Sequence, residues 1–193
     1  MSLILASNSQ IRREILEQAG LDFEVRSPEF DEDEAKRSFD GDSEILARTL
    51  AAGKAASIAS ESGDWVIGSD STVTVDGVRY SKPRDRDEAV AHLRAFSDRV
   101  MLLSSAVALA RRGKVEWVHT ETARLYWRPL SDRFITSYLD EEWPEVGYCV
   151  GVFRMEGRGV TLFERVEGSH FTILGMPLLP LLGALRDRGQ MPS

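Results

Sequence analysis

The pattern of hydrophobic and polar positions predicts alternating strands and helices from the first residues onward. The apolar run Leu3–Ala6 is typical of a strand that is buried on both faces. Polar residues follow it, and Ile11, Ile15 and Leu16 then recur at helical spacing as far as Gly20. A glycine in that place predicts the end of a helix. The first twenty residues therefore indicate a strand, a polar turn and a helix.

The same pattern continues through the rest of the chain. Further strands are expected at Phe23–Arg26, Trp65–Ile67, Val73–Tyr80, Met101–Ala110 and Val115–Trp127. Further helices are expected after Ser43, from the charged segment 84–87 to Phe96, after Ser131 and after Pro177. An acidic loop is expected at 29–42, and the glycines of 147–168 indicate strands and close turns near a cleft. The pattern predicts a mixed α/β fold with a central sheet.

Length and composition limit the class of protein. The chain has 193 residues, of which 42% are hydrophobic and 28% charged, so we expect one globular domain over residues 1–193. Its 31 acids against 24 bases give a net charge of -7, which argues against a nucleic acid polymer as partner. The single cysteine, Cys149, favours a reducing compartment, and the apolar stretch 174–182 is broken by two prolines. We therefore expect a cytoplasmic protein that is not inserted in a membrane.

The turn after the first strand is a candidate anion site. Ser7 and Ser9 stand before a helix N-terminus, where free backbone N–H groups and the helix dipole favour a phosphate. Arg12 and Arg13 lie in the first turn of that helix, where their charge opposes the dipole unless an anion binds. The alternative is a serine that only caps the helix, with both arginines in solvent.

Carboxylates offer a candidate site for a hard cation. Residues 31–34 are Asp-Glu-Asp-Glu, and such a run is either a solvated loop or a source of oxygen ligands for Mg²⁺ or Mn²⁺. Asp70 follows the strand Trp65–Ile67, where it either caps a turn or serves as a base or metal ligand. Asp76-Gly77 within Val73–Tyr80 predicts a hairpin turn, and Lys82 follows it and could return a cation to the same sheet edge.

Taken in order, these segments resemble the Maf family of nucleotide pyrophosphatases. Residues 5–13, Leu-Ala-Ser-Asn-Ser-Gln-Ile-Arg-Arg, resemble the family's Ala-Ser-x-Ser-Pro-x-Arg-Arg signature, and residues 29–32 resemble its Asp-Ile-Asp-Glu block. Further matches are Leu-Ala-Ala-Gly-Lys-Ala at 50–55, Gly-Ser-Asp at 68–70, Ser-Lys-Pro at 81–83, Glu-Gly-Arg-Gly at 156–159 and Gly-Met-Pro-Leu at 175–178. The resemblance runs through nearly the whole chain.

The resemblance implies both a fold and a reaction. The fold would be an elongated central sheet with flanking helices and two lobes around a cleft, similar to inosine triphosphate pyrophosphatases. The reaction would be hydrolysis of a nucleoside triphosphate to a monophosphate and pyrophosphate with Mg²⁺, or with Mn²⁺ or Co²⁺ instead. By motif position Asp70 would accept the proton, and Glu32 would bind metal or water. Lys54, Lys82 and Arg12 would contact phosphate.

Within the family the chain resembles the 7-methyl-GTP branch most. Glu156 stands where the dTTP/UTP branch has Gln, and a carboxylate there would accept guanine N–H groups. Ile11 and Ser71 differ from both branches at positions linked to base choice, and Gln10 replaces the family Pro. The resemblance therefore indicates the reaction more clearly than the nucleobase of the substrate.

Other readings of the chain remain open at this stage. One is a nucleotide-binding regulator of cell division that does not need catalysis, and another is a pyrophosphatase for dTTP, UTP or ITP. Retention of Glu32, Lys54, Asp70 and Lys82 together favours an enzyme, since binding alone would not require the acidic pair. Exposed strand edges and the family resemblance also suggest a homodimer.

Overall fold

A computed structural model of the chain describes residues 2–58 and 63–192. Its strands are β1 (Leu3–Ala6), β2 (Phe23–Arg26), β3 (Trp65–Val75), β4 (Val78–Tyr80), β5 (Val100–Arg111), β6 (Lys114–Trp127) and β7 (Phe163–Glu167). Its α-helices are α1 (Gln10–Gln18), α2 (Glu32–Arg37), α3 (Ser43–Ser57), α4 (Arg86–Phe96), α5 (Asp132–Glu142), α6 (His170–Ile173) and α7 (Leu178–Arg186). Two 3₁₀ helices, η1 (Glu145–Tyr148) and η2 (Arg158–Leu162), complete the described elements.

The strands form one seven-stranded sheet, which confirms the mixed α/β prediction. Its order is β2-β1-β3-β5-β6-β7, with β4 paired to β3. Strand β1 is parallel to β2 and β3, whereas β4 and β7 are antiparallel to their neighbours. The chain divides into two compact units: unit 1 takes in the described residues of 1–71, 104–121 and 169–193, and unit 2 takes in 72–103 and 122–168.

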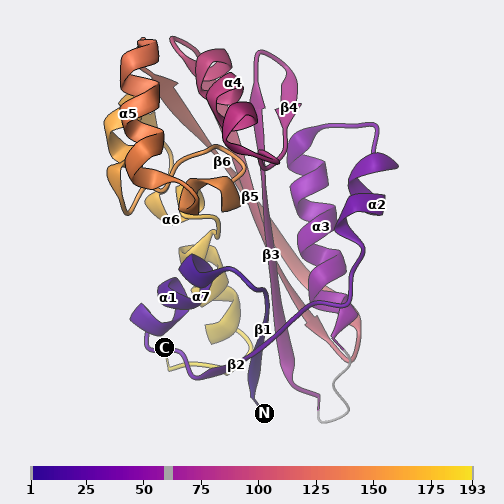
Figure 1. Cartoon of the computed structure of the whole chain (residues 1–193). Helices are drawn as coiled ribbons and strands as arrows, with labels where there is room; N and C mark the ends of the chain where they lie inside the picture. Colours follow the sequence, from indigo (N-terminus) through magenta and orange to yellow (C-terminus); the bar gives the residue numbers. More distant parts are fainter. Residues whose placement is uncertain (1, 59–62, 193) are drawn as a thin grey trace. The chain divides into compact units, whose positions relative to one another are not determined.

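Unit 1 consists of a layer of strands between two layers of helices. Side chains alternate across a strand, so Leu3 and Leu5 of β1 belong to one hydrophobic cluster and Ile4 and Ala6 to another. The first cluster includes residues of α1 and α7, and the second includes the alanine-rich face of α3. Figure 1 shows α1 and α7 on one side of β3 and α3 on the other.

Helix α3 packs directly on the backbone of β3. A Cβ atom at Gly68 would lie 2.3 Å from the carbonyl oxygen of Ala51 and 2.5 Å from the backbone nitrogen of Ala55. Neither α3 residue has a side chain larger than a methyl group, so helix and strand approach as closely as their backbones allow. This contact fixes how far α3 stands from the strand that carries Asp70.

Unit 2 has an aromatic core around Trp127. The indole lies 5.1 Å from the ring of Phe96 and 4.9 Å from that of Phe163, measured between ring centroids, and both contacts are inclined rather than stacked. Such geometries suit the quadrupoles of aromatic rings. Helices α4 and α5 lie side by side in this unit, and each begins at a side-chain cap, from Asp85 and Ser131 respectively.

Several predicted boundaries were wrong. The acidic loop contains α2, whose start is capped by Asp31, and Asp42 rather than Ser43 caps α3. The strands predicted at 65–67 and within 73–80 are joined in β3, so Asp70 lies inside a strand and not after one. Segment 147–168 holds the end of η1, the whole of η2 and one short strand, β7, and the short helix α6 was not predicted.

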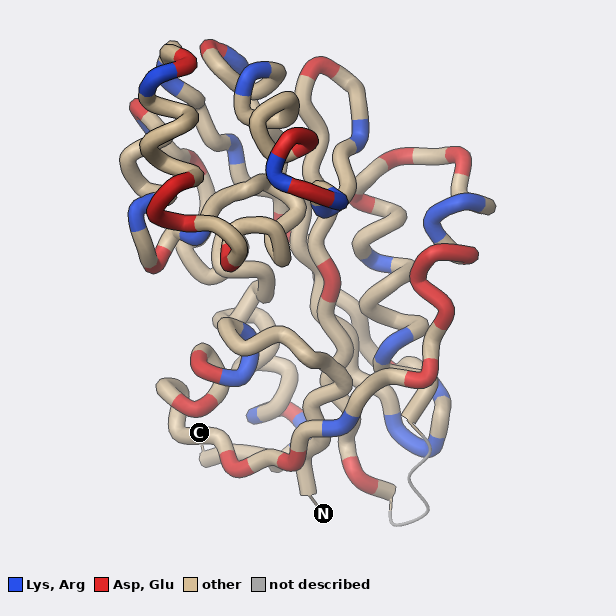
Figure 2. Tube along the Cα trace, in the orientation of Figure 1, with Lys and Arg blue, Asp and Glu red and all other residues tan. Residues whose placement is uncertain are grey.

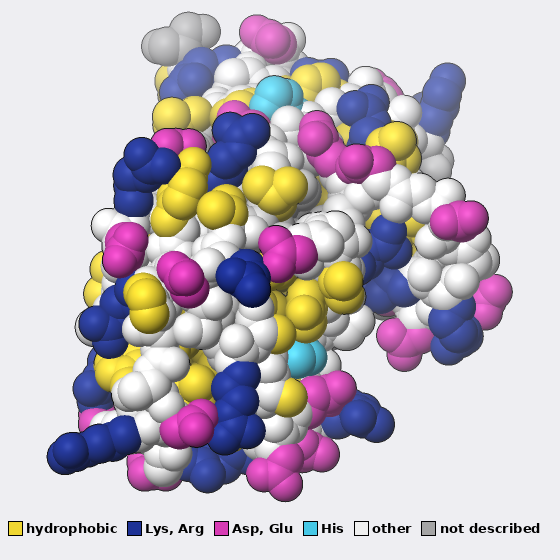
Figure 3. Space-filling model, turned by 90° about the horizontal axis from the view of Figure 1, so that it is seen from above, with side chains coloured by type: hydrophobic (Ala, Val, Ile, Leu, Met, Phe, Trp, Pro, Cys, Tyr) yellow, Lys and Arg dark blue, Asp and Glu magenta, His cyan; other side chains and the backbone are white. Residues whose placement is uncertain are grey.

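The apolar character of the helices and the distribution of surface charge complete the description of the fold. None of the described helices is long and apolar enough to cross a membrane. On the face shown in Figure 3, acidic and basic side chains are interspersed, with hydrophobic side chains scattered among them.

Replacing Gly68 with alanine tests the close packing of α3 on β3. We expect Gly68→Ala to lower the free energy of unfolding by about 1–3 kcal/mol, because the new methyl group meets backbone atoms that cannot move independently. Chemical denaturation measures the change. Gly183→Ala in α7 is the matched control, since its Cβ would meet nothing within 4 Å and alanine favours helix. Equal stability of the two variants would contradict this account of the packing.

Candidate active site

The candidate site lies where β1 has ended and β3 continues. The last pair of the parallel ladder joins Ala6 to Gly68, and β3 runs on to Val75. Residues Ser69, Asp70 and Ser71 therefore lie beyond the carboxyl end of β1, next in space to the turn that leads into α1. An edge of this kind in an α/β sheet is the usual place for a ligand.

Lys54 joins two carboxylates from different elements. Its Nζ atom lies 2.7 Å from Oε1 of Glu32 and 3.3 Å from Oδ2 of Asp70. The side chains of Lys54 and Asp70 are only 7% and 11% exposed, whereas that of Glu32 is 35% exposed. An ammonium group this deeply buried requires partners of opposite charge, and α2 and β3 each supply one.

The packing of Phe30 on α3 explains why Glu32 reaches Lys54. A Cβ atom at Gly53 would lie 2.4 Å from the Phe30 ring, so glycine leaves the space that the ring fills. Asp31 then caps α2 by accepting a hydrogen bond from the Glu34 backbone N–H at 2.9 Å. Figure 2 shows the acidic start of α2 followed by its basic end, an order that favours the helix dipole.

Asp70 keeps one carboxylate oxygen without a hydrogen bond. Oδ1 accepts a hydrogen bond from the backbone N–H of Ser71 at 2.7 Å. Oδ2 is buried and is 3.3 Å from Lys54 Nζ, close enough for an ion pair, yet it has no hydrogen-bond partner among the described residues. Buried carboxylate oxygens are normally satisfied, so this atom is suited to a ligand, a water molecule or a cation.

Arg12 is not in solvent, which corrects the alternative that both arginines of this turn are solvated. Its guanidinium group donates to the carbonyls of Gly175 and Ser69 and to the hydroxyl of Ser71, at 3.0, 2.9 and 3.2 Å. Its Nη2 atom is 4.0 Å from Oδ1 of Asp70. Burial lowers the pKa of Arg12, while the charges of Asp70 and Glu32 oppose that shift.

The other predicted residues of the turn have varied surroundings. The hydroxyl of Ser7 is buried and accepts a hydrogen bond from the Ser9 backbone N–H at 3.2 Å, and Ser9 stands at the N-cap of α1 without a side-chain cap bond. Arg13 is exposed, and Ile11 packs against the hydrophobic cluster between α1, α7 and the sheet. The structure thus gathers the turn, α1 and Asp70 in one unit.

Lys82 and Glu156 belong to unit 2, and both side chains are exposed. They are close enough to Cys149 to affect the same thiol. Burial and, to a smaller extent, the charge of Glu156 raise the pKa of Cys149 to about 11, while Lys82 and Arg154 act in the opposite direction. Within unit 2, these two predicted site residues are therefore brought to one region.

Three polar groups around Arg12 were missed in the sequence. They are the hydroxyl of Ser105, the backbone of Thr172 and the carbonyl of Gly175. A serine pair inside the otherwise apolar segment 101–110 was the available signal, since a buried hydroxyl needs a partner. The contacts made by the backbone carbonyls of Thr172 and Gly175 cannot be predicted from the pattern of side chains.

The chemistry of the donor set fits a hard divalent cation. Among the described residues no group of three or more His, Cys, Asp or Glu side chains could hold a metal. Mg²⁺, however, commonly takes one or two protein carboxylates and completes its shell with water and substrate phosphate. Glu32 and Asp70, both adjacent to Lys54 Nζ, match that pattern, and Asp70 has an oxygen without a hydrogen bond.

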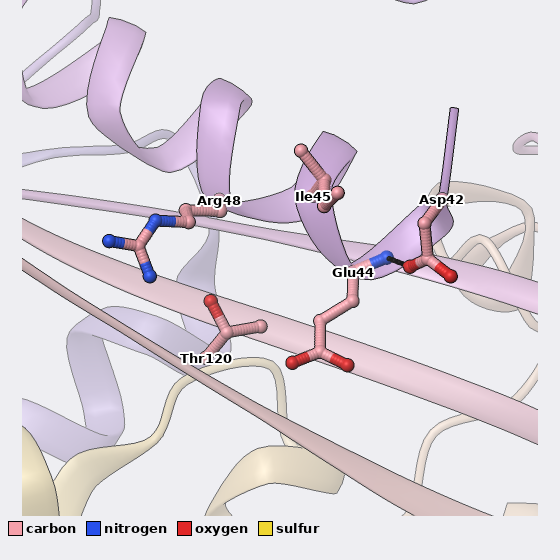
Figure 4. A pocket seen from close by; sticks show the side chains of 5 residues that line it. All are labelled: Asp42, Glu44, Ile45, Arg48 and Thr120. Carbon is pink, nitrogen blue, oxygen red and sulfur yellow. Dashed lines mark hydrogen bonds between the residues drawn. The ribbon is translucent and has the colours of Figure 1, made fainter. Parts of the chain in front are cut away.

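A separate hollow in unit 1 does not involve these residues. It has a volume of about 260 Å³ and is lined by Asp42, Glu44, Ile45, Arg48 and Thr120. Figure 4 shows side chains from the start of α3 facing Thr120, with the Asp42 carboxylate bonded to the Glu44 backbone. None of the predicted site residues lines this hollow, so we do not assign the active site to it.

Comparison with known proteins gives matches over nearly the whole chain. The family model described as "Maf-like protein" matches residues 2–188. The chain is 44% identical to the "7-methyl-GTP pyrophosphatase" of Rhizobium meliloti, covering 99% of this chain and 98% of the relative. It is also 44% identical to the "Nucleoside triphosphate pyrophosphatase" of Nitrobacter winogradskyi, covering 96% and 93%. The solved Staphylococcus aureus Ham1 protein shares the fold, with a TM-score of 0.51 at 16% identity over 98% of this chain and 100% of that one.

The carboxyl group of Glu32 gives a pH dependence to stability. Burial acts to raise its pKa, but the hydrogen bond and charge of Lys54, with those of Lys36, outweigh burial and lower the pKa below 4.5. A carboxyl group whose pKa is lowered in the folded state stabilises the fold at pH values above its pKa in the unfolded chain. This stabilisation is lost as the pH falls through the pKa of the folded state. The stability difference between wild type and Glu32→Gln should therefore be largest near neutral pH and shrink below about pH 4.5.

Denaturant unfolding at several pH values measures this difference. Glu34→Gln is the control, because Glu34 pairs with Arg37 at 2.9 Å on the same helix and both side chains are more than 60% exposed. Exposed pairs contribute about 0–1 kcal/mol, so this variant should differ less from wild type. Indistinguishable pH profiles for the two variants would show that the Lys54 contact does not stabilise Glu32.

Proposed function

The chain belongs to the Maf family, and we propose that it hydrolyses nucleoside triphosphates to the monophosphate and pyrophosphate. The observation that carries the proposal is the buried Asp70 carboxylate beside Lys54 and Glu32, one oxygen of which accepts no hydrogen bond from any residue that the structure describes. The names of the two relatives support the reaction, since one is a nucleoside triphosphate pyrophosphatase and the other a 7-methyl-GTP pyrophosphatase.

We assign the proton transfer to Asp70. Its carboxylate accepts a proton from a water molecule as the water oxygen forms a bond to the α-phosphorus. The bond between that phosphorus and the oxygen that bridges to the β-phosphate breaks, and pyrophosphate leaves with the bonding electrons. The proton then passes from Asp70 to solvent, which restores the carboxylate.

Cationic side chains reduce the cost of the developing charge. Lys54 and Arg12 are already buried in unit 1, so they act on phosphate oxygens without having to be desolvated first. We assign Ser7 and Ser9, with the N-terminus of α1 and Arg13, to binding of the triphosphate. Lys82 of unit 2 is a further phosphate contact in this proposal.

A divalent cation, Mg²⁺ in the first place, is part of the proposal. Glu32 and Asp70 would hold it, and when bound it would neutralise phosphate charge and polarise the phosphoryl group. Mn²⁺ and Co²⁺ are alternatives of similar charge. Lys54 pairs with both carboxylates and holds them close together, which prepares them for the cation and orients Asp70.

For the substrate we propose 7-methyl-GTP. Glu156 is exposed in unit 2, and a carboxylate can accept the N–H donors of a guanine and pair with a methylated, cationic base. The relative from Rhizobium meliloti carries this substrate in its name. dTTP, UTP and ITP are the competing substrates, because Ile11 and Ser71 match neither branch of the family.

The domain organisation, the compartment and the oligomeric state are also proposals. The family match spans parts of both compact units, so we propose that residues 1–193 act as one catalytic domain. The single cysteine supports a reducing, cytoplasmic compartment. Strands β2 and β7 stand at the ends of the sheet order, and we propose that such an edge strand supplies the contact of a homodimer.

A nucleotide panel with the Asp70→Asn variant tests the reaction. We expect pyrophosphate release from the wild type, fastest with 7-methyl-GTP among 7-methyl-GTP, dTTP, UTP, CTP and ITP. Asp70→Asn should reduce turnover by about 10²–10⁴-fold, because an amide cannot accept the proton. Asp22→Asn, at an exposed position of unit 1, should retain wild-type turnover. Tight nucleotide binding without any pyrophosphate release would favour the regulator instead.

Removal of the cation tests the metal assignment separately. A chelator should abolish pyrophosphate release, and added Mg²⁺ should restore it. Glu32→Gln should raise the Mg²⁺ concentration needed for half-maximal release by at least about 10-fold. Loss of a group that only supports a metal ligand can already weaken metal binding by about that factor. Full activity in the chelator, or an unchanged Mg²⁺ requirement in Glu32→Gln, would argue against this assignment.

A further inference from the structure

The guanidinium group of Arg12 is held by a layer of groups that the reaction does not use. Its Nε–H donates to the Gly175 carbonyl, one Nη1–H to the Ser69 carbonyl and one Nη2–H to the Ser71 hydroxyl. Arginine has five N–H donors, so one on each terminal nitrogen has no hydrogen-bond acceptor among the described residues. Nη2 also lies 4.0 Å from Oδ1 of Asp70, so these two N–H groups are the ones left for phosphate oxygens beside the candidate base.

The direction of each hydrogen bond beyond Arg12 can be derived from the donors available. Arginine only donates, so the Ser71 oxygen accepts from it. The Ser71 hydroxyl lies 2.8 Å from that of Ser105 and 3.3 Å from the Gly175 carbonyl, and Ser105 lies 2.7 Å from the Thr172 carbonyl. Since that carbonyl can only accept, the Ser105 proton goes to Thr172, and Ser105 can only accept from Ser71. The Ser71 proton then goes to Ser105, which is nearer than its other acceptor, the Gly175 carbonyl.

The backbone turn that accepts these bonds is itself anchored. The Thr172 hydroxyl donates to the carboxylate of Glu121 on β6, and Thr172 is fully buried. Gly175 has a φ of +104°, and a Cβ atom there would lie 3.4–3.6 Å from Ser71 Oγ and the Arg12 guanidinium. The turn therefore brings its carbonyl close to Arg12, where the hydroxyl of Ser69 also donates to it at 3.0 Å.

We propose that Ser105 is a positioning residue for Arg12, acting through Ser71 and the 172–175 turn. Ser105 has no exposed surface, and two successive hydrogen bonds, through the Ser71 hydroxyl, connect it to the guanidinium group. By fixing the Ser71 proton, it leaves the Ser71 lone pair directed to Arg12 and keeps the remaining two N–H groups in one orientation. The kinetic part of this inference rests on the proposed function.

Ser105→Ala compared with Ser104→Ala tests the role. Ser104 is its neighbour on β5 and is also buried, but strand alternation places it on the α3 side of the sheet. We expect Ser105→Ala to lower kcat about 10-fold with KM changed less than about 2-fold, since misorientation affects the transition state most. Ser104→Ala should stay within about 2-fold of wild type in both constants.

A double-variant cycle separates positioning from a general loss of structure. If Ser105 acts through Arg12, Ser105→Ala should cause no further loss of kcat once Arg12→Lys is present. An equal loss in both backgrounds would overturn the proposal. Ser71→Ala, at a partly exposed position, breaks the same network from its other end and should reproduce the kinetic change of Ser105→Ala.

Hydrogen exchange of the Arg12 Nε–H, followed by nuclear magnetic resonance, gives a readout independent of turnover. The signal is assigned by its absence in Arg12→Lys. We expect exchange at least about 10-fold faster in Ser105→Ala and in Ser71→Ala, and unchanged in Ser104→Ala. Unchanged exchange in both network variants would overturn the positioning role. Absence of pyrophosphate release from the wild type would instead overturn the proposed function, and the exchange measurement would still decide the role of Ser105.

Discussion

The ion pairs of Lys54 set the constraint on which unit 1 depends. A buried ammonium group without counter-charges is very costly, so α3, the 29–34 segment and β3 must meet in one register. Two glycines make that register reachable, because Gly68 lets α3 approach β3 and Gly53 accepts the Phe30 ring. The close packing of α3 on β3 and on Phe30 is therefore also what brings the charged side chains of the site together.

Elements with a hydrophobic period were predictable from the sequence, and the polar ones were not. Strands β1 and β2 and helix α1 follow the apolar spacing closely. Helix α2 has no buried residue and is stabilised by its cap and by exposed ion pairs, so its sequence has the composition of a loop. Strand β3 appeared as two pieces because polar residues of the candidate site interrupt its apolar pattern.

The candidate site was predictable as a set of residue types but not as a network. The order of the motifs brought together Arg12, Glu32, Lys54 and Asp70, and the structure gathers all four in unit 1. The hydrogen bonds that orient Arg12 come from residues 57 to 163 positions away along the chain, and two of the acceptors are carbonyl oxygens. Every residue has a carbonyl group, so no sequence pattern marks the ones that a fold will use.

The surroundings of three positions bear on where the base would be read. Ile11 packs against the hydrophobic cluster, and the Ser71 hydroxyl is engaged by Arg12 and Ser105. Neither side chain is therefore well placed to offer a donor or an aromatic face to a nucleobase. Glu156 is exposed in the other unit, and in the proposed function its carboxylate pairs with a methylated guanine. On that proposal the base and the phosphates are bound by different residues, so a change at Glu156 alters base choice while the Lys54 ion pairs stay unchanged.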